Sequence, residues 1–452
     1  MKKYYNILML ILPILIVYLY RINYNYLYHA VDDVAINYSI LNGEYMLLPY
    51  IGIVLSYLLV IIQSIIPAIN IYFIFLIVAY SLSFSIFLYL VKEHKNKYAL
   101  FSVILILEIL ILKYFTYSVV AYLLSLAGVL LLYKNKHTLL SYVVIFVGFS
   151  LRIQVITSIL ILLIAIILYE TIVKKEKRKV FSLALIIIAI FLSNKMVTTS
   201  NQTVSEYLSW NDKSTQIRDY PAINYEDYVK QLQEINISQN DLDTYNSWIF
   251  AEKNVFNENM LSNLDNMRSI SEKYNFSIRE TALELFSSEL IKVFIYFVIL
   301  FLIFFRVKNR YGYLLILTPI LSLIALVIRQ RLVERVYIPI ICVAILAIIL
   351  SGEDFFERKR YKILKNTEGI SFGILCFLFL SYIISFGKNN LYWFTYQKHQ
   401  LNPEYNNVLK NNKENLYIFL GYSNIINSQA NVSKVFVDRN NLFSNSTTLG
   451  TW

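Results

Sequence analysis

The stretch YYNILMLILPILIVYLYRINYNYLYHAVDD, residues 4–33, carries an apolar segment that is followed by two adjacent acids. Because about 20 helical residues cross the hydrocarbon core of a bilayer, the apolar part predicts a membrane-spanning helix. Asp32 and Asp33 then lie just past its exit, where the membrane meets water. One carboxylate there can act as a base or hold a cation, and the second perturbs the titration of the first. We therefore predict that this pair is functional.

The composition of the whole chain predicts an all-α polytopic membrane protein. Of its 452 residues 57% are hydrophobic, and the mean hydropathy of +0.54 excludes an ordinary soluble enzyme. We attribute the net charge of +11 to cytoplasmic loops and expect no nucleic-acid partner. The cysteines, Cys342 and Cys376, lie in apolar runs, so neither a disulfide framework nor a cysteine metal site is expected. Heavy use of Ile, Asn, Lys and Tyr points to an AT-rich, bacterial genome.

Apolar stretches long enough to span a bilayer recur along the chain. The predicted spans, about 11 in number, are 4–22, 69–91, 98–112, 114–133, 138–151, 153–173, 180–194, 290–305, 311–328, 335–351 and 369–387. One further apolar stretch, 46–66, is ambiguous by length alone. The charges of the short loops decide how it is interpreted.

Lys and Arg are retained on the cytoplasmic side of membrane proteins. The short basic loops of this chain are 92–97, 134–137, 173–179, 306–310 and 353–362. All of them fall inside, together with the N-terminus, only if 46–66 does not span. We therefore predict that 46–66 forms an interfacial or re-entrant pair of helices on the outer face, punctuated by Pro49, Gly52 and Pro67. The predicted protein is a multi-pass plasma-membrane protein with a cytoplasmic N-terminus and an extracytoplasmic C-terminus.

The predicted organisation is a transmembrane domain, 1–387, and a small extracytoplasmic C-terminal domain, 388–452. The first includes an outer loop, 23–68, and a large outer loop, 195–289, which has 15 acids against 8 Lys and Arg. Within the large loop, Ser238 to Asp241 reads as a helix start. The C-terminal segment is expected to be a mixed α/β appendage. Its predicted strands are 416–422 and 434–438.

Four arginines break the charge rule on the predicted outer side. Arg329, Arg331 and Arg335 lie in one loop, RQRLVER, at the mouths of two spans. Since arginine makes forked contacts with phosphate oxygens, this loop predicts a phosphate cradle. Arg152 lies in a hairpin with no other charge, where ionisable groups usually face a cavity or a partner. The alternatives are contact with lipid headgroups, pairing with Glu334 and, for Arg152, a structural salt bridge.

Other polar residues are candidate substrate contacts. Glu108 lies in the apolar run LILEILIL, and it either joins the site or pairs with Lys113 or Arg152. His29 precedes the acidic pair, where a lone histidine is more often an interface residue than a catalyst. Arg218 and Asp219 either close over a substrate or pair locally. No P-loop, HExxH, GxSxG or CxxC pattern supports ATP-driven or zinc-dependent chemistry.

The segment DDVAINYSILNGEYMLLPY, residues 32–50, and the run that ends near Pro67 resemble the GT-C membrane glycosyltransferases. An acidic pair, a Gly-Tyr-type turn at Gly43 to Tyr45 and a Pro-x-x-Asn from Pro67 to Asn70 carry the resemblance. It covers roughly 20–150 well and continues more loosely through Arg152, the Arg329–Arg335 loop and the final LGTW. The segment is similar to a group of bacterial membrane proteins of that general plan.

The resemblance implies a glycosyltransferase that moves a sugar from a polyprenyl-phosphate carrier to an extracytoplasmic acceptor, a glycan or a lipid-linked one, in cell-envelope polysaccharide assembly. It implies that Asp32 or Asp33 is the catalytic base, and that Arg329, Arg331, Arg335 and Arg152 bind the lipid phosphate. In some members of the family this acid helps to hold a metal, so the resemblance leaves open whether a divalent cation is bound. No residue is assigned as a metal ligand, and no cofactor is certain. These roles agree with acid–base and electrostatic catalysis.

Other functional classes remain open from the sequence. A polysaccharide polymerase or a lipid-linked oligosaccharide flippase also uses outer arginines on a lipid pyrophosphate, but it does not require an acidic pair after the first span. A solute transporter predicts broken helices and internal symmetry, and neither is evident. A non-catalytic scaffold predicts that the acids and the arginine loop do not meet.

Overall fold

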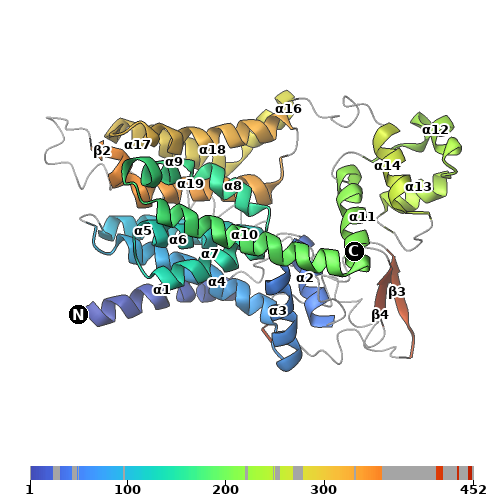
Figure 1. Ribbon diagram of the computed structural model, residues 1–452, viewed down its shortest axis with the longest axis horizontal. Helices are drawn as coiled ribbons and strands as arrows, with labels where there is room; N and C mark the ends of the chain where they lie inside the picture. Colours follow the sequence, from blue (N-terminus) through green and yellow to red (C-terminus); the bar gives the residue numbers. More distant parts are fainter. Residues whose placement is uncertain are drawn as a thin grey trace.

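The structure is a computed structural model, and it describes the greater part of the chain. The described residues are 2–23, 31–42, 48, 50–94, 97–218, 222–247, 249, 255–267, 278–329, 332–358, 414–420, 435–436 and 446–449. With 81% of the structure helical, the all-α prediction is confirmed. Long apolar helices lie side by side in a bundle, and shorter polar helices extend from one end of it (Figure 1).

The bundle is built from two runs of helices. The N-terminal run is α1 (Lys2–Asn23), α2 (Val31–Asn42), α3 (Ile53–Ile65), α4 (Ile71–Val91), α5 (Lys97–Leu112), α6 (Tyr117–Tyr133), α7 (Thr138–Leu151), α8 (Val155–Leu162), α9 (Ile164–Leu168), the π-helix Tyr169–Val173 and α10 (Lys177–Ser200). The second run is α16 (Ile278–Ser287), α17 (Glu289–Phe304), α18 (Tyr311–Ile328) and α19 (Glu334–Phe355). The antiparallel strands β1 (Phe305–Val307) and β2 (Phe356–Arg358) join the ends of α17 and α19.

Every predicted span except 369–387, which lies outside the described residues, coincides with helix. Among the described helices α4, α10, α18 and α19 are long and apolar enough to cross a membrane, and two bent pairs raise the number to six. One bent pair, α8 with residues 164–173, turns by 61° within the predicted span 153–173. These helices are compatible with a membrane protein, and the full number of 11 spans stays a prediction.

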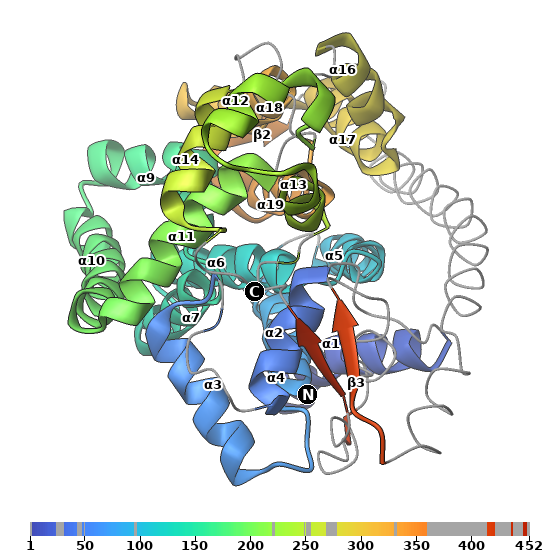
Figure 2. The same cartoon turned by 90° about the vertical axis from the view of Figure 1, so that its right-hand side faces the viewer.

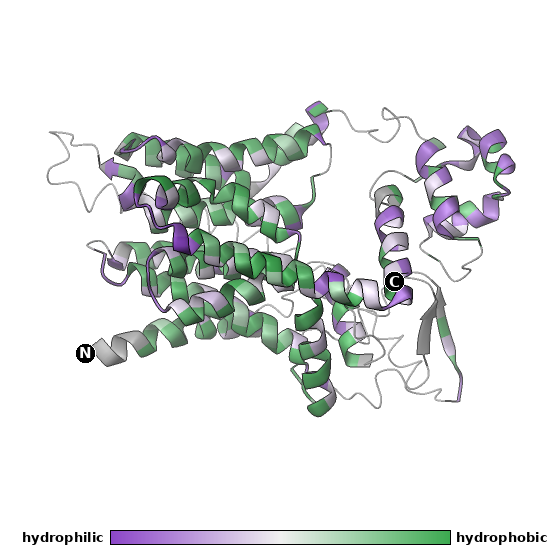
Figure 3. Cartoon of the chain, viewed as in Figure 1, coloured by the Kyte–Doolittle hydropathy of each residue, from purple (hydrophilic) through white to green (hydrophobic). Residues whose placement is uncertain are grey.

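The basic loops gather at one end of the bundle, which we call the basic end. His94 contacts Glu353 at 2.8 Å, Lys134 contacts Asp354 at 3.3 Å, and Lys174 lies 3.9 Å from the same Asp354. These ion pairs connect the loops after α4, α6 and the π-helix to the end of α19. The polar loops at this end stand out against the apolar helices (Figure 3). The prediction that these loops share one side of the helices is confirmed, whereas their side of a membrane stays a prediction.

The ambiguous stretch 46–66 holds one helix, α3, and not the expected pair. α3 runs across the direction of the long helices (Figure 1). Gln63 fixes its end, because its amide donates to the carbonyl of Ile69 at 2.9 Å and accepts from the backbone N–H of Ile71 at 3.0 Å. The second transverse helix is instead α2, which begins immediately before the acidic pair. The described residues between α2 and α3, Leu48 and 50–52, are not helical, so the two helices are α2 and α3 rather than a pair within 46–66.

The large loop contains a helical module with its own hydrophobic core. Its helices are α11 (Gln202–Arg218), α12 (Val229–Glu234), α13 (Gln239–Asn246) and α14 (Glu258–Met267), with a 3-10 turn at Tyr225–Asp227. The predicted helix start is confirmed, since Ser238 and Asp241 form a reciprocal capping box. Leu232, Leu242 and Leu261 are fully buried in the core of this module. The module lies at the end of the bundle opposite to the basic end (Figure 1), and this end faces the viewer in Figure 2.

Two short strands are described in the C-terminal segment. β3 (Tyr417–Leu420) lies within the predicted strand 416–422, and it pairs in parallel with β4 (Ser446–Leu449), which was not predicted. Of the predicted strand 434–438, Val435 and Phe436 are described. Phe436 bridges Ile69, and the backbone N–H of Asn70 donates to the carbonyl of Val435 at 2.8 Å. The C-terminal segment therefore contacts the turn that leads into α4.

Glycine allows α6 and α7 to approach each other closely. A Cβ added to Gly128 would lie 2.8 Å from the backbone nitrogen of Ile145, and one added to Gly148 would lie 2.8 Å from the backbone nitrogen of Ser125. Such distances are too short for any side chain, so both helix backbones depend on the missing Cβ. Small residues at close helix crossings are typical of packing in membranes.

This packing predicts opposite effects for two alanine substitutions. Gly128→Ala should lower the free energy of unfolding by about 1–3 kcal/mol, because it overpacks the α6–α7 contact. Gly352→Ala is the matched control, since a Cβ there meets no atom within 4 Å and alanine is favoured over glycine in a helix by about 0.5–1 kcal/mol. Thermal unfolding of the purified protein in detergent measures both. Equal stability of the two variants would contradict the described packing.

Candidate functional site

Asp33 connects three helices at the end opposite to the basic end. It lies in the first turn of α2 and is fully buried. Its Oδ1 accepts a hydrogen bond from the hydroxyl of Tyr72 on α4 at 2.9 Å and another from the backbone N–H of Tyr117, the first residue of α6, at 2.9 Å. The latter satisfies one of the N–H groups that every helix start leaves unpaired. Asp33 therefore holds α2 against the beginnings of α4 and α6.

The other carboxylate oxygen of Asp33 makes no such contact. Oδ2 is buried and has no hydrogen-bond partner among the described residues. Burial raises the pKa of Asp33 to about 7, the hydrogen bonds from Tyr117 and Tyr72 oppose this rise, the neighbouring Asp32 adds to it, and Arg152 also opposes it. Asp33 consequently titrates near neutral pH in the folded protein.

Asp32 forms an ion pair with the arginine loop. Its Oδ2 lies 2.6 Å from Nη1 of Arg335, which follows the first residue of α19. The Asp32 carboxylate is almost buried, whereas 29% of the Arg335 side chain is exposed. A charge-assisted hydrogen bond of this length joins residues that are 303 positions apart in the chain. The structure thus brings the acidic pair and this member of the arginine loop into direct contact.

Arg152 completes the group from the end of α7. Its guanidinium donates a hydrogen bond to the hydroxyl of Ser118, and it lies over the ring of Tyr117 at 5.3 Å from the ring centroid. Arg152 and Arg335 both act electrostatically on Tyr117, as do Asp32 and Asp33. The candidate site therefore consists of two acids and two arginines arranged around Tyr117. This arrangement can neutralise a phosphate beside a carboxylate.

The remaining predicted residues divide into two groups. Arg329 is exposed at the C-cap of α18, and no contact among the described residues joins it to the site. His29, Arg331 and Asp219 lie outside the described residues, as does the side chain of Arg218. Their proposed roles stay predictions.

Glu108 does not pair as the sequence suggested. It is fully buried in α5, and neither of its carboxylate oxygens has a hydrogen-bond partner among the described residues. The nearest polar contact of this residue is made by its backbone, because the carbonyl oxygen accepts a hydrogen bond from the hydroxyl of Tyr80. Of the two alternatives, the pairing of Glu108 with Lys113 or Arg152 is not found among the described residues, because its carboxylate oxygens are buried without a hydrogen-bond partner.

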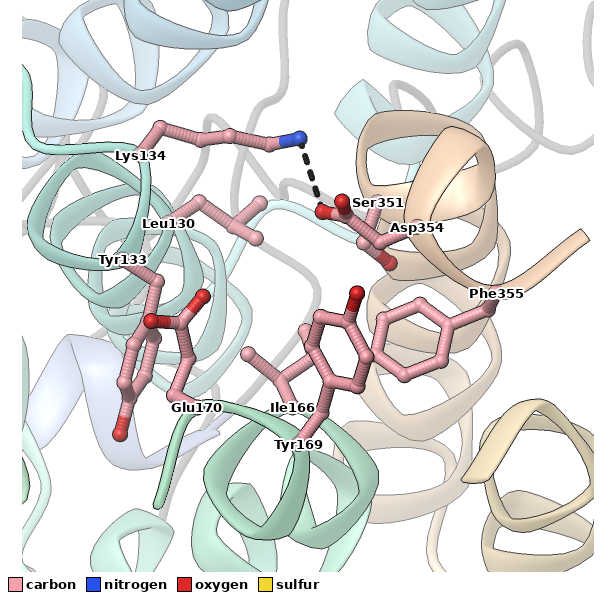
Figure 4. Close-up of a pocket in the computed structure, with 9 residues that line it drawn as sticks. All are labelled: Leu130, Tyr133, Lys134, Ile166, Tyr169, Glu170, Ser351, Asp354 and Phe355. Carbon is pink, nitrogen blue, oxygen red and sulfur yellow. Dashed lines mark hydrogen bonds and ion pairs between the residues drawn. The ribbon is translucent and has the colours of Figure 1, made fainter. Parts of the chain in front are cut away.

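The described residues offer no metal cluster, and the cavity found among them lies at the basic end rather than at the acidic pair. The part of the chain that the structure describes holds no group of three or more His, Cys, Asp or Glu side chains that could bind a metal ion. A cavity of about 10 Å³ lies at the basic end, between the ends of α6 and α19 and the π-helix (Figure 4). Its lining includes Tyr133, Glu170 and Asp354, and Lys134 closes it with the ion pair to Asp354. That volume holds at most one water molecule, so this cavity is not a substrate site.

Comparison with known proteins gives no further assignment. No family model, curated protein or solved structure matches this chain. The candidate site is therefore defined by its own geometry.

Three site residues were missed by the sequence reading. Tyr72, Tyr117 and Ser118 all lie in apolar segments that were predicted to be spans, where hydropathy alone does not single out a polar side chain. Tyr72 and Tyr117 occupy the first turns of α4 and α6, which was a signal available in the sequence. Both helix starts belong to the same end as Asp33, so their polar groups were candidates for the buried acid.

The titration of Asp33 predicts a pH dependence of stability. Its pKa is raised from about 3.8 in the unfolded chain to about 7 in the fold, so the folded state holds a proton that the unfolded state releases. The stability that this proton contributes is complete below about pH 4, falls as pH rises toward 7 and stays lost above that. Asp33→Asn, whose amide oxygen still accepts both hydrogen bonds, should flatten this part of the curve.

The measurement is the difference in melting temperature between wild type and Asp33→Asn from pH 4 to pH 8. The comparison with the variant removes the contribution of other titrating groups. A difference that does not change with pH would contradict the assignment of the titration to Asp33.

Proposed function

We propose that the protein is a membrane glycosyltransferase, similar in plan to the GT-C superfamily, that takes a sugar from a polyprenyl-phosphate carrier on the extracytoplasmic side. The observation that carries the proposal is the contact of Asp32 with Arg335, next to Arg152. A carboxylate that removes a proton and guanidinium groups that bind a phosphate leaving group are the two functions that such a transfer needs. The acceptor is a glycan or lipid-linked hydroxyl in the cell envelope.

Asp32 is the better candidate for the base. It borders the exposed side of the site through Arg335, whereas Asp33 is fully enclosed and one of its oxygens holds Tyr72 and the start of α6. A base must come within hydrogen-bond distance of the proton that it removes, so exposure decides between the two acids. Asp33 is then a positioning residue that fixes the first turn of α2 and with it the carboxylate of Asp32.

Arg335 and Arg152 support the donor half of the reaction. Each has used one N–H in the contacts described, and an arginine carries five. The remaining N–H groups can bind the phosphate oxygens of the carrier as negative charge develops on the leaving group. Apolar helices around the site suit a carrier whose lipid tail lies in the bilayer.

The test is sugar transfer by the purified protein with polyprenyl-phosphate sugars. Asp32→Asn should lower the turnover number by about 100-fold to 10,000-fold, the contribution typical of general acid–base catalysis, because the amide cannot take a proton. Arg335→Lys should retain part of the activity, since lysine keeps the charge and loses the forked contact. Melting temperature checks that each variant folds.

Glu353→Gln at the basic end is the matched control and should transfer sugar as wild type does. Unchanged transfer by a folded Asp32→Asn protein would reject the proposal and favour a polymerase or flippase, which does not require the acid. Absence of transfer by wild type with every tested carrier would reject the donor class.

A further inference from the structure

Three buried polar groups next to the acids have no partner within the described structure. They are Oδ2 of Asp33, both side-chain polar atoms of Asn37 and the hydroxyl of Tyr117. All three residues are fully buried. An unsatisfied buried polar group costs about 1–3 kcal/mol, and more than nine in ten of the buried polar groups in native proteins are paired. Such a concentration of unpaired groups in one place indicates that a polar ligand belongs there.

The three groups lie on neighbouring surfaces. Asp33 and Asn37 are four residues apart on α2, so their side chains lie one above the other on the same helix face. That face is turned toward α4 and α6, because Asp33 contacts Tyr72 and the backbone of Tyr117. The Tyr117 ring in turn lies beneath the Arg152 guanidinium. The Tyr117 hydroxyl, on which both arginines and both acids act electrostatically, therefore adjoins the arginines, and Asn37 lies one helical turn beyond Asp33 on α2.

The chemistry of these groups selects a hydroxyl-bearing ligand. The amide of Asn37 offers donors and an acceptor, the phenol of Tyr117 offers one of each, and Oδ2 of Asp33 accepts when the acid is ionised and donates when it is protonated. A sugar hydroxyl both donates and accepts, so adjacent hydroxyls can satisfy all three groups in either state of Asp33. An ionised phosphate only accepts, so it is better placed against the permanently charged Arg152 and Arg335.

We propose that Asn37, Tyr117 and Oδ2 of Asp33 form the subsite for the sugar of a sugar–phosphate donor whose phosphate binds Arg152 and Arg335. This inference rests on the proposed function, and it adds the residues that recognise the transferred sugar. The ligand enters past Arg335, of whose side chain 29% is exposed. Tyr117 then donates to one sugar hydroxyl, and Asn37 bonds a neighbouring one.

The first test compares the binding of two kinds of probe to the full-length protein in detergent. One probe is farnesyl phosphate, and the others are farnesyl phosphate linked to glucose, galactose, mannose or N-acetylglucosamine. Wild type should bind at least one of the linked probes about tenfold more tightly than farnesyl phosphate, because a site built to bond hydroxyls discriminates against a ligand that lacks them. Equal affinity for all probes overturns the subsite.

Two variants locate the gain in affinity. Tyr117→Phe and Asn37→Leu should bind farnesyl phosphate as wild type does and lose most of the additional affinity for the sugar. Tyr142→Phe, which removes a tyrosine hydroxyl that contacts Ser182 between α7 and α10, is the matched control and should keep that affinity. Retention of the full gain in both Tyr117→Phe and Asn37→Leu overturns the assignment of these residues.

Stability gives a readout that does not need a ligand. Tyr117→Phe removes a hydroxyl that has no partner, so its melting temperature should equal or exceed that of wild type. Tyr72→Phe removes a hydroxyl bonded to Asp33 and should melt lower. If Tyr117→Phe melts as low as Tyr72→Phe, the Tyr117 hydroxyl has a structural role and the subsite is wrong.

The two proposals fail in different ways. Sugar-dependent affinity without transfer would reject the proposed function and leave a sugar-binding site in place. Transfer in wild type without any sugar-dependent affinity would reject the subsite alone.

Discussion

The carboxylate of Asp33 is the constraint on which the architecture of the bundle depends at the end opposite to the basic end. A single oxygen accepts hydrogen bonds from α4 and α6, so the transverse helix α2 has one orientation against the bundle. The orientation of α2 determines where Asp32 points and hence its contact with Arg335. Because the acceptor is buried, each lost hydrogen bond leaves a polar group unsatisfied, which costs more than the bond itself contributes in water. The protein thus uses one acid to position the other.

Much of the bundle was accessible from the sequence. Hydropathy predicted the helical segments because a chain in an apolar environment must satisfy its backbone within helices. The basic loops were predicted to share one side, and their ion pairs with Glu353 and Asp354 place them together. Arg335 and Arg152 were selected because basic residues are unexpected on the predicted outer side, and both lie near Tyr117. These predictions succeeded because they rest on local composition and on alternation of sides along the chain.

The remaining features depend on contacts between distant segments. Hydropathy does not distinguish a straight helix from the bent pair α8 and residues 164–173, since both are apolar. Nor does it separate Tyr117, whose hydroxyl is enclosed beside charged groups, from tyrosines at a lipid boundary. The sequence left open whether Glu108 joins the site or pairs with a basic residue, because the burial of its carboxylate depends on helices that pack against α5. The helical module of the large loop was hidden because a small core needs only a few apolar residues spread over many polar ones.

The ion pairs at the basic end have a mechanical consequence. Glu170 is nearly enclosed between Lys174 and Lys179, and Asp354 at the end of α19 contacts both Lys134 and Lys174, so the loops after α6 and the π-helix are joined to α19. At the opposite end α2 is held by the hydrogen bonds of Asp33 and by the ion pair of Asp32 with Arg335. A molecule that separates the helices from the basic end must therefore break ion pairs on several loops, whereas one that enters past Arg335 displaces a single ion pair, so entry is directed toward the end that contains α2.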